Sequence, residues 1–166
     1  MVTIRPAVES DVPTIHGLIL DLARFENLLS KVHVTEETLR RDGFGADPKF
    51  ECLLAENAGP EGPEAVGLAL YFTIYSTFAG RAGLYLEDLV VAESARGLGV
   101  GRRLIERMAQ IAIERDCGRM DLSALHWNPA RKFYEALGAE ELGGWLQYRF
   151  GEAALRRLAH TQPDDE

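Results

Sequence analysis

"ARGLGVGRRLIERM", residues 95–108, places three alternate glycines between an apolar strand pattern and an amphipathic helix pattern. Glycine adopts backbone conformations that a Cβ forbids, so successive backbone N–H groups can converge on one anion. They do so at a helix N-terminus, where backbone donors lack partners and the helix dipole is positive. We therefore predict that the segment binds a phosphate group. The alternative interpretation is a glycine-rich turn with its arginines in solvent.

Two common nucleotide motifs do not fit this segment. A dinucleotide fingerprint requires G-x-G-x-x-G, whereas the glycines here read G-x-G-x-G and are followed by Arg102. A P-loop requires a lysine followed by serine or threonine, and neither pair follows the glycines. The pattern that remains is R-x-x-G-x-G, from Arg96 to Gly101.

Length and composition favour one globular domain over residues 1–166, with a polar tail at 160–166. The formal net charge of −8 argues against nucleic-acid binding and suits a small cationic ligand. No apolar run is long enough to span a membrane, and no export signal is recognised, so a cytoplasmic location is expected. Cys52 and Cys117 are too few for a disulfide framework or a zinc site, and no metal is expected.

The hydrophobic patterns predict a mixed α/β (α+β) sheet protein rather than a regular βαβ alternation. Ser10 or Asp11 could cap the first helix, Thr35 the second, with Gly43 and Gly45 ending it. Strands are expected over residues 3–8, 50–57, 65–76, 84–92, 118–125 and 145–150, and helices over 9–29, 34–45, from 101 onward, 128–139 and 151–159.

The glycine loop and the order of elements resemble the GCN5-related N-acetyltransferase (GNAT) superfamily, in which such a loop binds the CoA pyrophosphate. "RFENL", "DGFGADPKFECLLAE", "LYLEDLVV", "RGLGVGRRL", "WNPARKFYEALGA" and "GW" occur in the order found in diamine acetyltransferases. That family includes the spermidine/spermine N1- and thialysine Nε-acetyltransferases. The resemblance covers about residues 3–159. It implies a mostly antiparallel, twisted sheet of about six or seven strands flanked by about four helices.

The resemblance also implies a donor site for acetyl-CoA. Backbone groups of the strand pattern before the loop would pair with the pantetheine arm, and the loop would bind the phosphates. The helix near residue 128 would contribute further contacts, although a solvated Arg131 is an equal alternative. The predicted donor residues are Leu89, Val90, Val91, Arg96, Gly97, Leu98, Gly99, Val100, Gly101, Arg102, Asn128 and Arg131.

Tyr134 and Glu87 are the predicted catalytic residues. By resemblance, Tyr134 is the general acid that protonates the CoA sulfur, which suits a phenol that stays protonated at neutral pH. Glu87, through a water molecule, would help to deprotonate the acceptor amine. Without the resemblance, Tyr134 would be read as a core aromatic residue. The alternative for the two acids is a strand edge or bulge, with one of them in solvent.

The acceptor residues implied by resemblance are Phe25, Glu26, Glu87, Asp88 and Trp145. Carboxylates and aromatic faces suit an ammonium group. Because adjacent strand residues point to opposite faces, only one of Glu87 and Asp88 is expected to face the amine. The family also implies a homodimer.

The chain departs from the family in two places. The helix containing Tyr134 begins one residue closer to "WN", and "EELGGW" lacks the acids that usually precede Trp145, with Glu140 and Glu141 out of register. These changes favour a small amine, such as thialysine, a lysine-like compound or a short diamine, over a long polyamine. Protein or peptide acetylation, or a non-catalytic acyl-CoA-binding module, are the alternative functions.

Overall fold

The computed structural model describes residues 2–59 and 62–160, which divide into two compact units. The first unit comprises residues 1–127 and the second comprises residues 128–166. The N-terminal unit contains the sheet, the glycine loop and most of the predicted site residues. Each unit is described below by itself.

A five-stranded sheet in the order β1-β2-β3-β4-β5 forms the centre of the N-terminal unit. The first four strands pair antiparallel, and β5 pairs parallel with β4. The predominance of antiparallel pairing confirms the expected class of sheet. The strands are β1 (Thr3–Pro6), β2 (Glu51–Gly59), β3 (Gly62–Ser76), β4 (Arg81–Val91) and β5 (Met120–Leu122).

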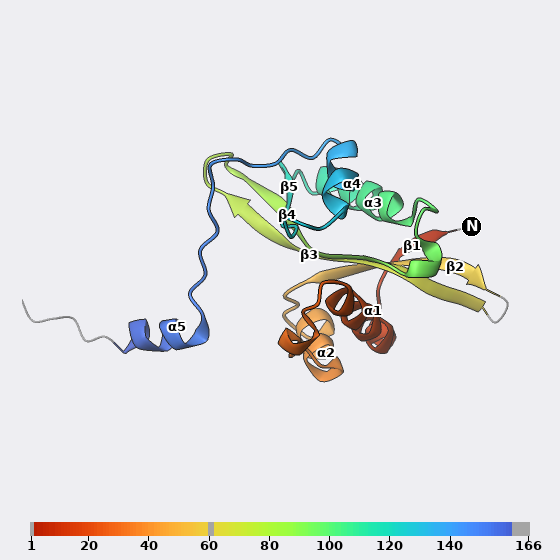
Figure 1. Cartoon of the computed structure of the whole chain (residues 1–166), viewed down its shortest axis with the longest axis horizontal. Coiled ribbons are helices and arrows are strands. Elements are labelled where there is room, and N and C mark those ends of the chain that lie inside the picture. The colour runs from red at the N-terminus through yellow and green to blue at the C-terminus, as the bar shows by residue number, and fades with distance from the viewer. Residues whose placement is uncertain (1, 60–61, 161–166) are drawn as a thin grey trace, which may run out of the picture. The chain divides into compact units, whose positions relative to one another are not determined.

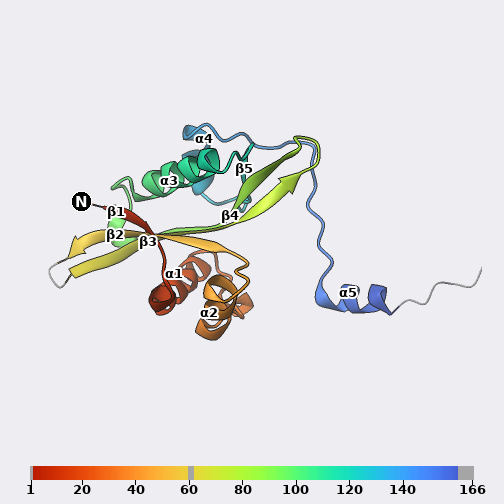
Figure 2. The ribbon, with the colours of Figure 1, turned by 180° about the vertical axis from the view of Figure 1, so that it is seen from behind.

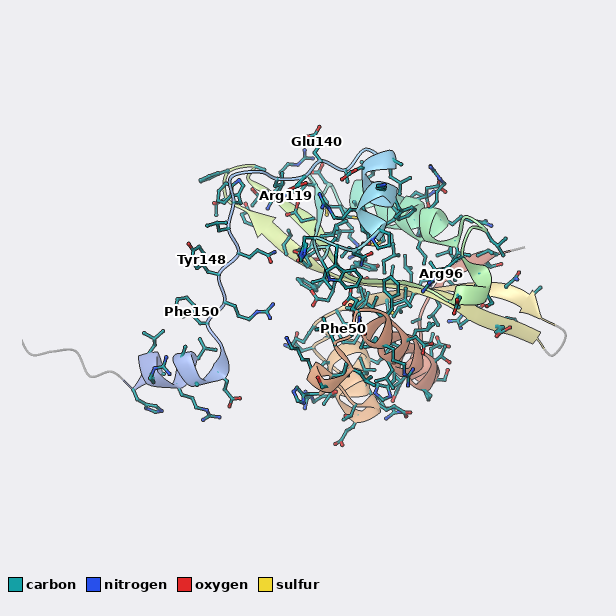
Figure 3. All side chains as sticks on the ribbon, in the orientation of Figure 1. Phe50, Arg96, Arg119, Glu140, Tyr148 and Phe150 are labelled. Carbon is teal, nitrogen blue, oxygen red and sulfur yellow. The ribbon has the colours of Figure 1, made fainter. Side chains whose placement is uncertain are left out.

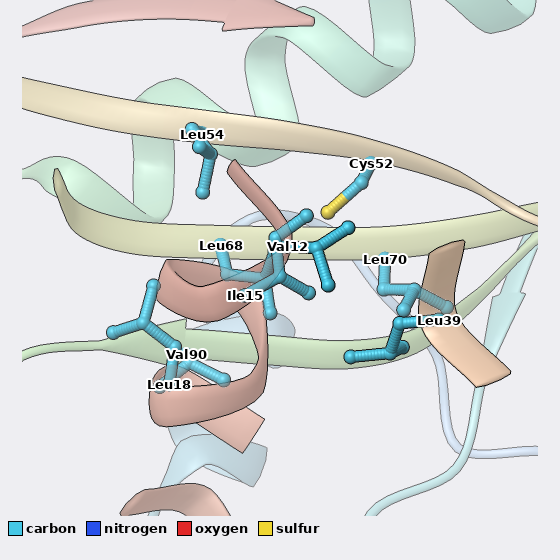
Figure 4. Packing of buried hydrophobic residues seen from close by; sticks show 9 residues of the cluster. All are labelled: Val12, Ile15, Leu18, Leu39, Cys52, Leu54, Leu68, Leu70 and Val90. Carbon is cyan, nitrogen blue, oxygen red and sulfur yellow. The ribbon is translucent and has the colours of Figure 1, made fainter. Parts of the chain in front are cut away.

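Three α-helices cover this sheet, with α1 and α2 on one face and α3 on the other (Figures 1 and 2). On the first face, aliphatic side chains of α1, α2 and the central strands form a continuous buried cluster (Figure 4). The helices are α1 (Val12–Phe25), α2 (Glu36–Phe44) and α3 (Val100–Glu114), with short 3-10 turns at Glu9–Asp11, Leu29–Lys31 and Glu93–Ala95.

The close approach of α3 to the sheet depends on Gly67 of β3. A Cβ at this position would lie 2.9 Å from a methyl carbon of Val100 and 3.0 Å from the Val90 carbonyl oxygen. Both distances are shorter than ordinary carbon contacts, so a larger residue would push α3 away. Gly67 therefore sets how near the start of α3, and the loop before it, lies to β4.

A β-bulge at Glu87 interrupts the pairing of β3 with β4. Leu70 pairs with Asp88 and Tyr71 with Leu86, which leaves Glu87 as the extra residue. One extra residue reverses which face each later side chain occupies. Val90, after the bulge, consequently lies in the cluster under α1. Leu86, before the bulge, belongs to the opposite face of the sheet and is also buried.

The predicted helix caps are partly confirmed. The Thr35 hydroxyl accepts the backbone N–H of Thr38 at 3.2 Å, as expected for the cap of α2. Gly45 is the last cap residue of α2, whereas Gly43 lies inside the helix. Asp11 occupies the N-cap position of α1 but makes no side-chain cap bond there, because its carboxylate pairs with Arg5.

The C-terminal unit contains α4 (Ala130–Ala136) and α5 (Glu152–Ala159). The strand expected over residues 145–150 is not formed, so that prediction is wrong. The segment has an alternating pattern, but an extended segment becomes a strand only when a neighbouring strand accepts its hydrogen bonds. The described residues therefore form five strands and five α-helices, rather than six or seven strands and about four helices.

No helix in the described ranges is long and apolar enough to cross a membrane. Most of the expected tail, residues 161–166, lies outside the described ranges.

Candidate active site

The glycine loop connects the 3-10 turn after β4 to the first residue of α3. Gly97 and Gly99 both have φ = 77°, a left-handed conformation that L residues with side chains rarely adopt. No atom lies within 4 Å of the position that a Cβ would occupy at either glycine. The loop thus needs glycine for its backbone conformation, and the space beside it is open. Helix α3 begins one residue earlier than expected, at Val100.

The residues around these glycines differ in whether their backbone or their side chain could contact a ligand. Val100 is buried in the core, so only its backbone N–H can serve a ligand. Leu98 is 63% exposed. Arg102 lies one turn before Glu106, 3.9 Å away, on the exposed side of α3. The orphan N–H groups at the start of α3 and the two left-handed glycines are therefore the part of the loop best suited to an anion.

The edge of β4 beside this loop can accept an extended ligand. Strand β5 pairs with β4 only at Leu84–Leu86, so no strand in the described ranges covers the following residues on that side. The N–H of Ala92 bonds across to Val66 of β3. Because hydrogen-bonding direction alternates along an antiparallel strand, Leu89 and Val91 present their backbone groups to the uncovered edge, and Val90 pairs with β3.

Arg96 lies over an aromatic ring. Its guanidinium carbon is 5.2 Å from the ring centroid of Phe25, the last residue of α1. Its Nε–H is 3.4 Å from the backbone oxygen of Val91. The residue predicted for the CoA pyrophosphate thus also contacts the residue predicted for the acceptor amine. Figure 3 shows Arg96 at the segment between β4 and α3.

Three carboxylates gather near the bulge in β4. Glu87 is exposed, whereas Asp88 and Glu26 are partly buried. Burial, and then the charges of Glu87 and Glu26, together raise the pKa of Asp88 to about 6. Burial also raises the pKa of Glu26 above its ordinary value. The charges that act on Asp88 are all negative, so an incoming cation would be strongly attracted to this position.

Glu87 and Asp88 differ in burial, with Asp88 the more shielded, and which of the two faces the amine stays a prediction. The physical reason for the difference in burial is not the one expected. Glu87 is the bulge residue itself, and Asp88 occupies the register of Val90 on the face covered by α1. Strand alternation was the expected cause, but the bulge determines which acid is shielded.

Trp127 joins this group, although the sequence analysis did not select it. Its ring centroid is 6.1 Å from that of Phe25, and the two planes are inclined by 49°. Phe25 is 39% exposed and Trp127 is 46% exposed. Large aromatic side chains that remain this exposed beside acidic groups offer a surface for an ammonium ligand. Its position directly before Asn128 in the "WN" pair was the signal that could have identified it.

In the C-terminal unit, Tyr134 lies in the middle of α4, and its ring contacts Phe133 edge to face at 5.3 Å between centroids. The Asn128 side-chain oxygen accepts the N–H of Ala130 at 2.9 Å and so supports the start of α4. Arg131 pairs with Glu141 at 2.7 Å. Asn128 and Arg131 thus have structural partners within their own unit.

Trp145 is 79% exposed within a segment rich in exposed apolar residues. Tyr148 and Phe150 project from the chain that leads to α5 (Figure 3). Their exposed fractions are 85% and 65%. A run of exposed aromatic residues of this size commonly marks an interaction surface.

Comparisons with known proteins agree with this fold and loop. The sequence profile of the Acetyltransferase (GNAT) family matches residues 19–139. The thialysine N-epsilon-acetyltransferase of Bos taurus is 43% identical over 95% of this chain and 97% of its own length. The spermidine/spermine N(1)-acetyltransferase-like protein 1 of Homo sapiens is 39% identical over 94% of this chain, which spans 23% of that longer protein.

Among solved structures, an integron cassette protein from the mobile metagenome of V. cholerae aligns with a TM-score of 0.78. It is 27% identical, and the alignment covers 96% of this chain and 98% of that one. The fold and the glycine loop define an acyltransferase scaffold. The chain belongs to the GNAT family and is an N-acetyltransferase.

Proposed function

We propose that this enzyme transfers the acetyl group of acetyl-CoA to a primary amine of a small cationic acceptor. The observation that carries the proposal is the acidic cluster of Glu26, Glu87 and Asp88 beside the exposed ring of Phe25. Glu87 and Asp88 of this cluster lie on β4, the strand that continues into the glycine loop, and Glu26 follows α1. Relatives with high identity over nearly their full length are named for the same chemistry.

The donor subsite uses backbone groups for most of its contacts. Leu89 and Val91 hydrogen-bond the pantetheine arm along the uncovered edge of β4. The N–H groups around Gly97, Gly99 and Gly101 bind the pyrophosphate, with Arg102 adding positive charge. The residues present fit this ligand, because both left-handed glycines leave open space where a side chain would otherwise stand. No metal ion takes part in the proposed reaction.

The proposed reaction is a direct attack of the amine on the thioester. The C–N bond forms, the C–S bond breaks, and Tyr134 donates its proton to the departing CoA thiolate; the acylated nitrogen then loses its extra proton through water, which restores the Tyr134 phenol. The ammonium group must first lose a proton, which passes through water to Glu87. Asp88 and Glu26 attract the cationic acceptor, and Phe25 supplies an aromatic face for it. Trp145 is the corresponding aromatic contact proposed on the C-terminal unit.

We favour a short acceptor, such as thialysine, a lysine-like amino acid or a short diamine. Of the two acids that precede Trp145, Glu141 is paired with Arg131 at 2.7 Å. Its charge is therefore balanced within its own unit, which leaves less negative charge for the distal amines of a long polyamine. The relative named for thialysine supports the same choice.

The test is CoA release from acetyl-CoA with a panel of thialysine, lysine, putrescine, spermidine and a lysine-containing peptide. Thialysine or another short amine should give the highest kcat/KM. Release with the peptide alone would replace this proposal with protein acetylation, and release with none of the amines would contradict it. Replacing Tyr134 with Phe should lower kcat about 100-fold, the contribution expected of a general acid, and leave CoA binding unchanged.

We also propose that the chain acts as a homodimer in the cytoplasm. The exposed apolar side chains between Leu142 and Phe150 support an interface between copies. Cys52 and Cys117 are both buried free thiols, which suits a reducing compartment. Light scattering after size exclusion should give twice the monomer mass, and a monomer at assay concentration would contradict the proposed dimer. The two units would then act together as one catalytic domain over residues 1–166.

A further inference from the structure

Arg96 makes two contacts that a residue serving only to bind a phosphate group would not need. Its Nε–H is directed to the carbonyl oxygen of Val91, and its guanidinium lies over the ring of Phe25. A planar guanidinium can stack flat on a ring while its edge donates hydrogen bonds, whereas a compact lysine ammonium has no plane to stack. These contacts therefore suit arginine better than lysine, although both carry a positive charge.

The stacked ring of Phe25 is held at a fixed helix end. Asn27 has φ = 58°, and the N–H of Leu28 bonds back to the carbonyl of Ala23 at 2.8 Å. This is the arrangement that ends helices with a left-handed residue. The backbone of Phe25 and Glu26 is thereby fixed, so the remaining freedom at this position is the rotation of the Phe25 side chain.

The Phe25 ring also lies near the ring of Trp127, and the two ring centroids are 6.1 Å apart. Arg96, Phe25 and Trp127 come from the loop after β4, the end of α1 and the segment after β5. Three separate elements thus meet at one aromatic ring. Phe25 directly precedes Glu26 in the chain, and the charge of Glu26 acts on Asp88.

We propose that Arg96 is a positioning residue that holds Phe25 against Trp127 and so links the pyrophosphate loop to the acceptor subsite. This inference rests on the proposed function, and it deepens the description of the same site. Loss of the stacking leaves Phe25 free to rotate, and the acceptor then binds to a less ordered surface. The role of Arg96 therefore appears in the KM for the amine as well as in binding of acetyl-CoA.

The kinetic test uses Arg96→Lys, which keeps the charge and removes the planar stack. The KM for the amine should rise by up to about five-fold, the upper size of an exposed cation–π contact, because lysine keeps the charge but loses the planar stack. Phe25→Leu should raise it similarly, and the double variant should be no worse than Phe25→Leu alone, because the two residues act through one contact. Arg103→Lys, an exposed arginine in the same helix start, is the matched control and should leave the KM for the amine unchanged.

Two kinetic results would overturn the proposal. One is an increase in the KM for acetyl-CoA with an unchanged KM for the amine, which would confine Arg96 to the donor. The other is full additivity of Arg96→Lys and Phe25→Leu, which would show that the two residues act independently.

A measurement without turnover separates this inference from the proposed function. The chain has two tryptophans, so Trp145→Phe leaves Trp127 as the only fluorescent reporter of this kind. In that background, Arg96→Lys should shift Trp127 emission to the red and increase its quenching by acrylamide, as Phe25 moves away. Unchanged emission and quenching would overturn the positioning role. If the wild-type enzyme acetylates no amine, the proposed function fails, but this measurement still decides the role of Arg96.

Discussion

Asp11 and Asp88 are both partly buried aspartates. Asp11 lies at the start of α1 beside a positive charge, whereas Asp88 is acted on by negative charges, one of them from Glu26 at the end of α1. Asp11 accepts two hydrogen bonds from Arg5, at 2.7 and 2.9 Å, and these hold its pKa below the ordinary value. Arg5 also bonds Glu56 of β2 at 2.6 Å, so the network ties β1, β2 and the start of α1 together. Asp88 instead faces the negative charges of Glu87 and Glu26, and its pKa is raised to about 6.

The difference indicates what each carboxylate does. A buried charge with a good partner is stable as it stands, and removing either member leaves the other unpaired. A partly buried acid among other acids is costly, and it becomes favourable when a cation arrives. Asp11 therefore has a structural role, whereas the surroundings of Asp88 support its proposed role in binding the cationic acceptor. This is the pattern expected where function is maintained at a cost in stability.

Among the changes that test the comparison of the two aspartates, the largest expected effect is that of Asp88→Asn on catalysis. With one carboxylate of the acceptor subsite neutralised, kcat/KM for the amine should fall about 30-fold or more, the cost of losing one partner of a shielded charge pair. The free energy of unfolding of Asp88→Asn should be equal to that of the wild type or higher. Asp21→Asn, an exposed acid on α1, is the matched control and should retain normal kinetics. Normal amine kinetics in Asp88→Asn would remove the distinction between the two aspartates.

The next effect is that of Asp11→Asn on stability. Loss of the charge leaves Arg5 with weaker hydrogen bonds, and the free energy of unfolding should fall by about 2 kcal/mol. That corresponds to a fall in Tm of about 4–8 °C for a chain of this size. Below the transition, kcat/KM for the amine should equal that of the wild type. Chemical denaturation and steady-state kinetics on the same preparation check both statements.

The pH dependence of stability should also distinguish the two residues. Asp88 binds its proton more tightly in the folded state, so its contribution to stability decreases as pH rises from about 4 to about 6. Asp11 binds its proton less tightly in the folded state, so its contribution is lost only as pH falls below about 4. Denaturation curves at pH 4 to 7 should show a smaller decrease in Asp88→Asn than in the wild type. An identical slope in both proteins would contradict the assignment.

The smallest expected effect is that of Glu26→Gln on the pH profile. The charge of Glu26 is the last of the causes that raise the pKa of Asp88, after burial and Glu87. Removing it should move the acidic limb of amine binding to lower pH by a few tenths of a pH unit, while the shape of the profile is kept. A profile of amine KM against pH checks this. Movement of the limb to higher pH would show that Glu26 does not act on Asp88 through its charge.

Much of this fold could be predicted because the signals are local. The helical spacing of apolar residues in α1 and α3 reflects which side of each helix is buried, and Thr35 caps α2 as its residue type suggests. The glycine loop was recognised for the same reason, since a left-handed backbone at Gly97 and Gly99 requires glycine. The strand expected at 145–150 was wrong because pairing depends on a neighbour that the segment's own pattern does not reveal.

The candidate site was predictable in its membership more than in its geometry. Phe25, Glu26 and Asp88 were selected by resemblance, and the structure brings Glu26 close enough for its charge to act on Asp88. Trp127 was missed because its only signal is its place before Asn128 in the "WN" pair, and an aromatic residue after a short strand otherwise fits a core equally well. The roles of all these residues, and those of Tyr134 and Glu87, stay predictions, which the Tyr134 and Asp88 variants described above test directly.

The sequence by itself determined the chemistry available to this protein: a glycine loop that needs left-handed backbone, and acids inside an apolar strand. These properties are local, because they follow from a residue's own conformational limits and charge. Only the tertiary structure decided that Asp88 rather than Glu87 is shielded, and that Arg96 stacks on Phe25. Both depend on the bulge and on contacts between residues far apart in the chain, since one residue of register exchanges the two faces of a strand.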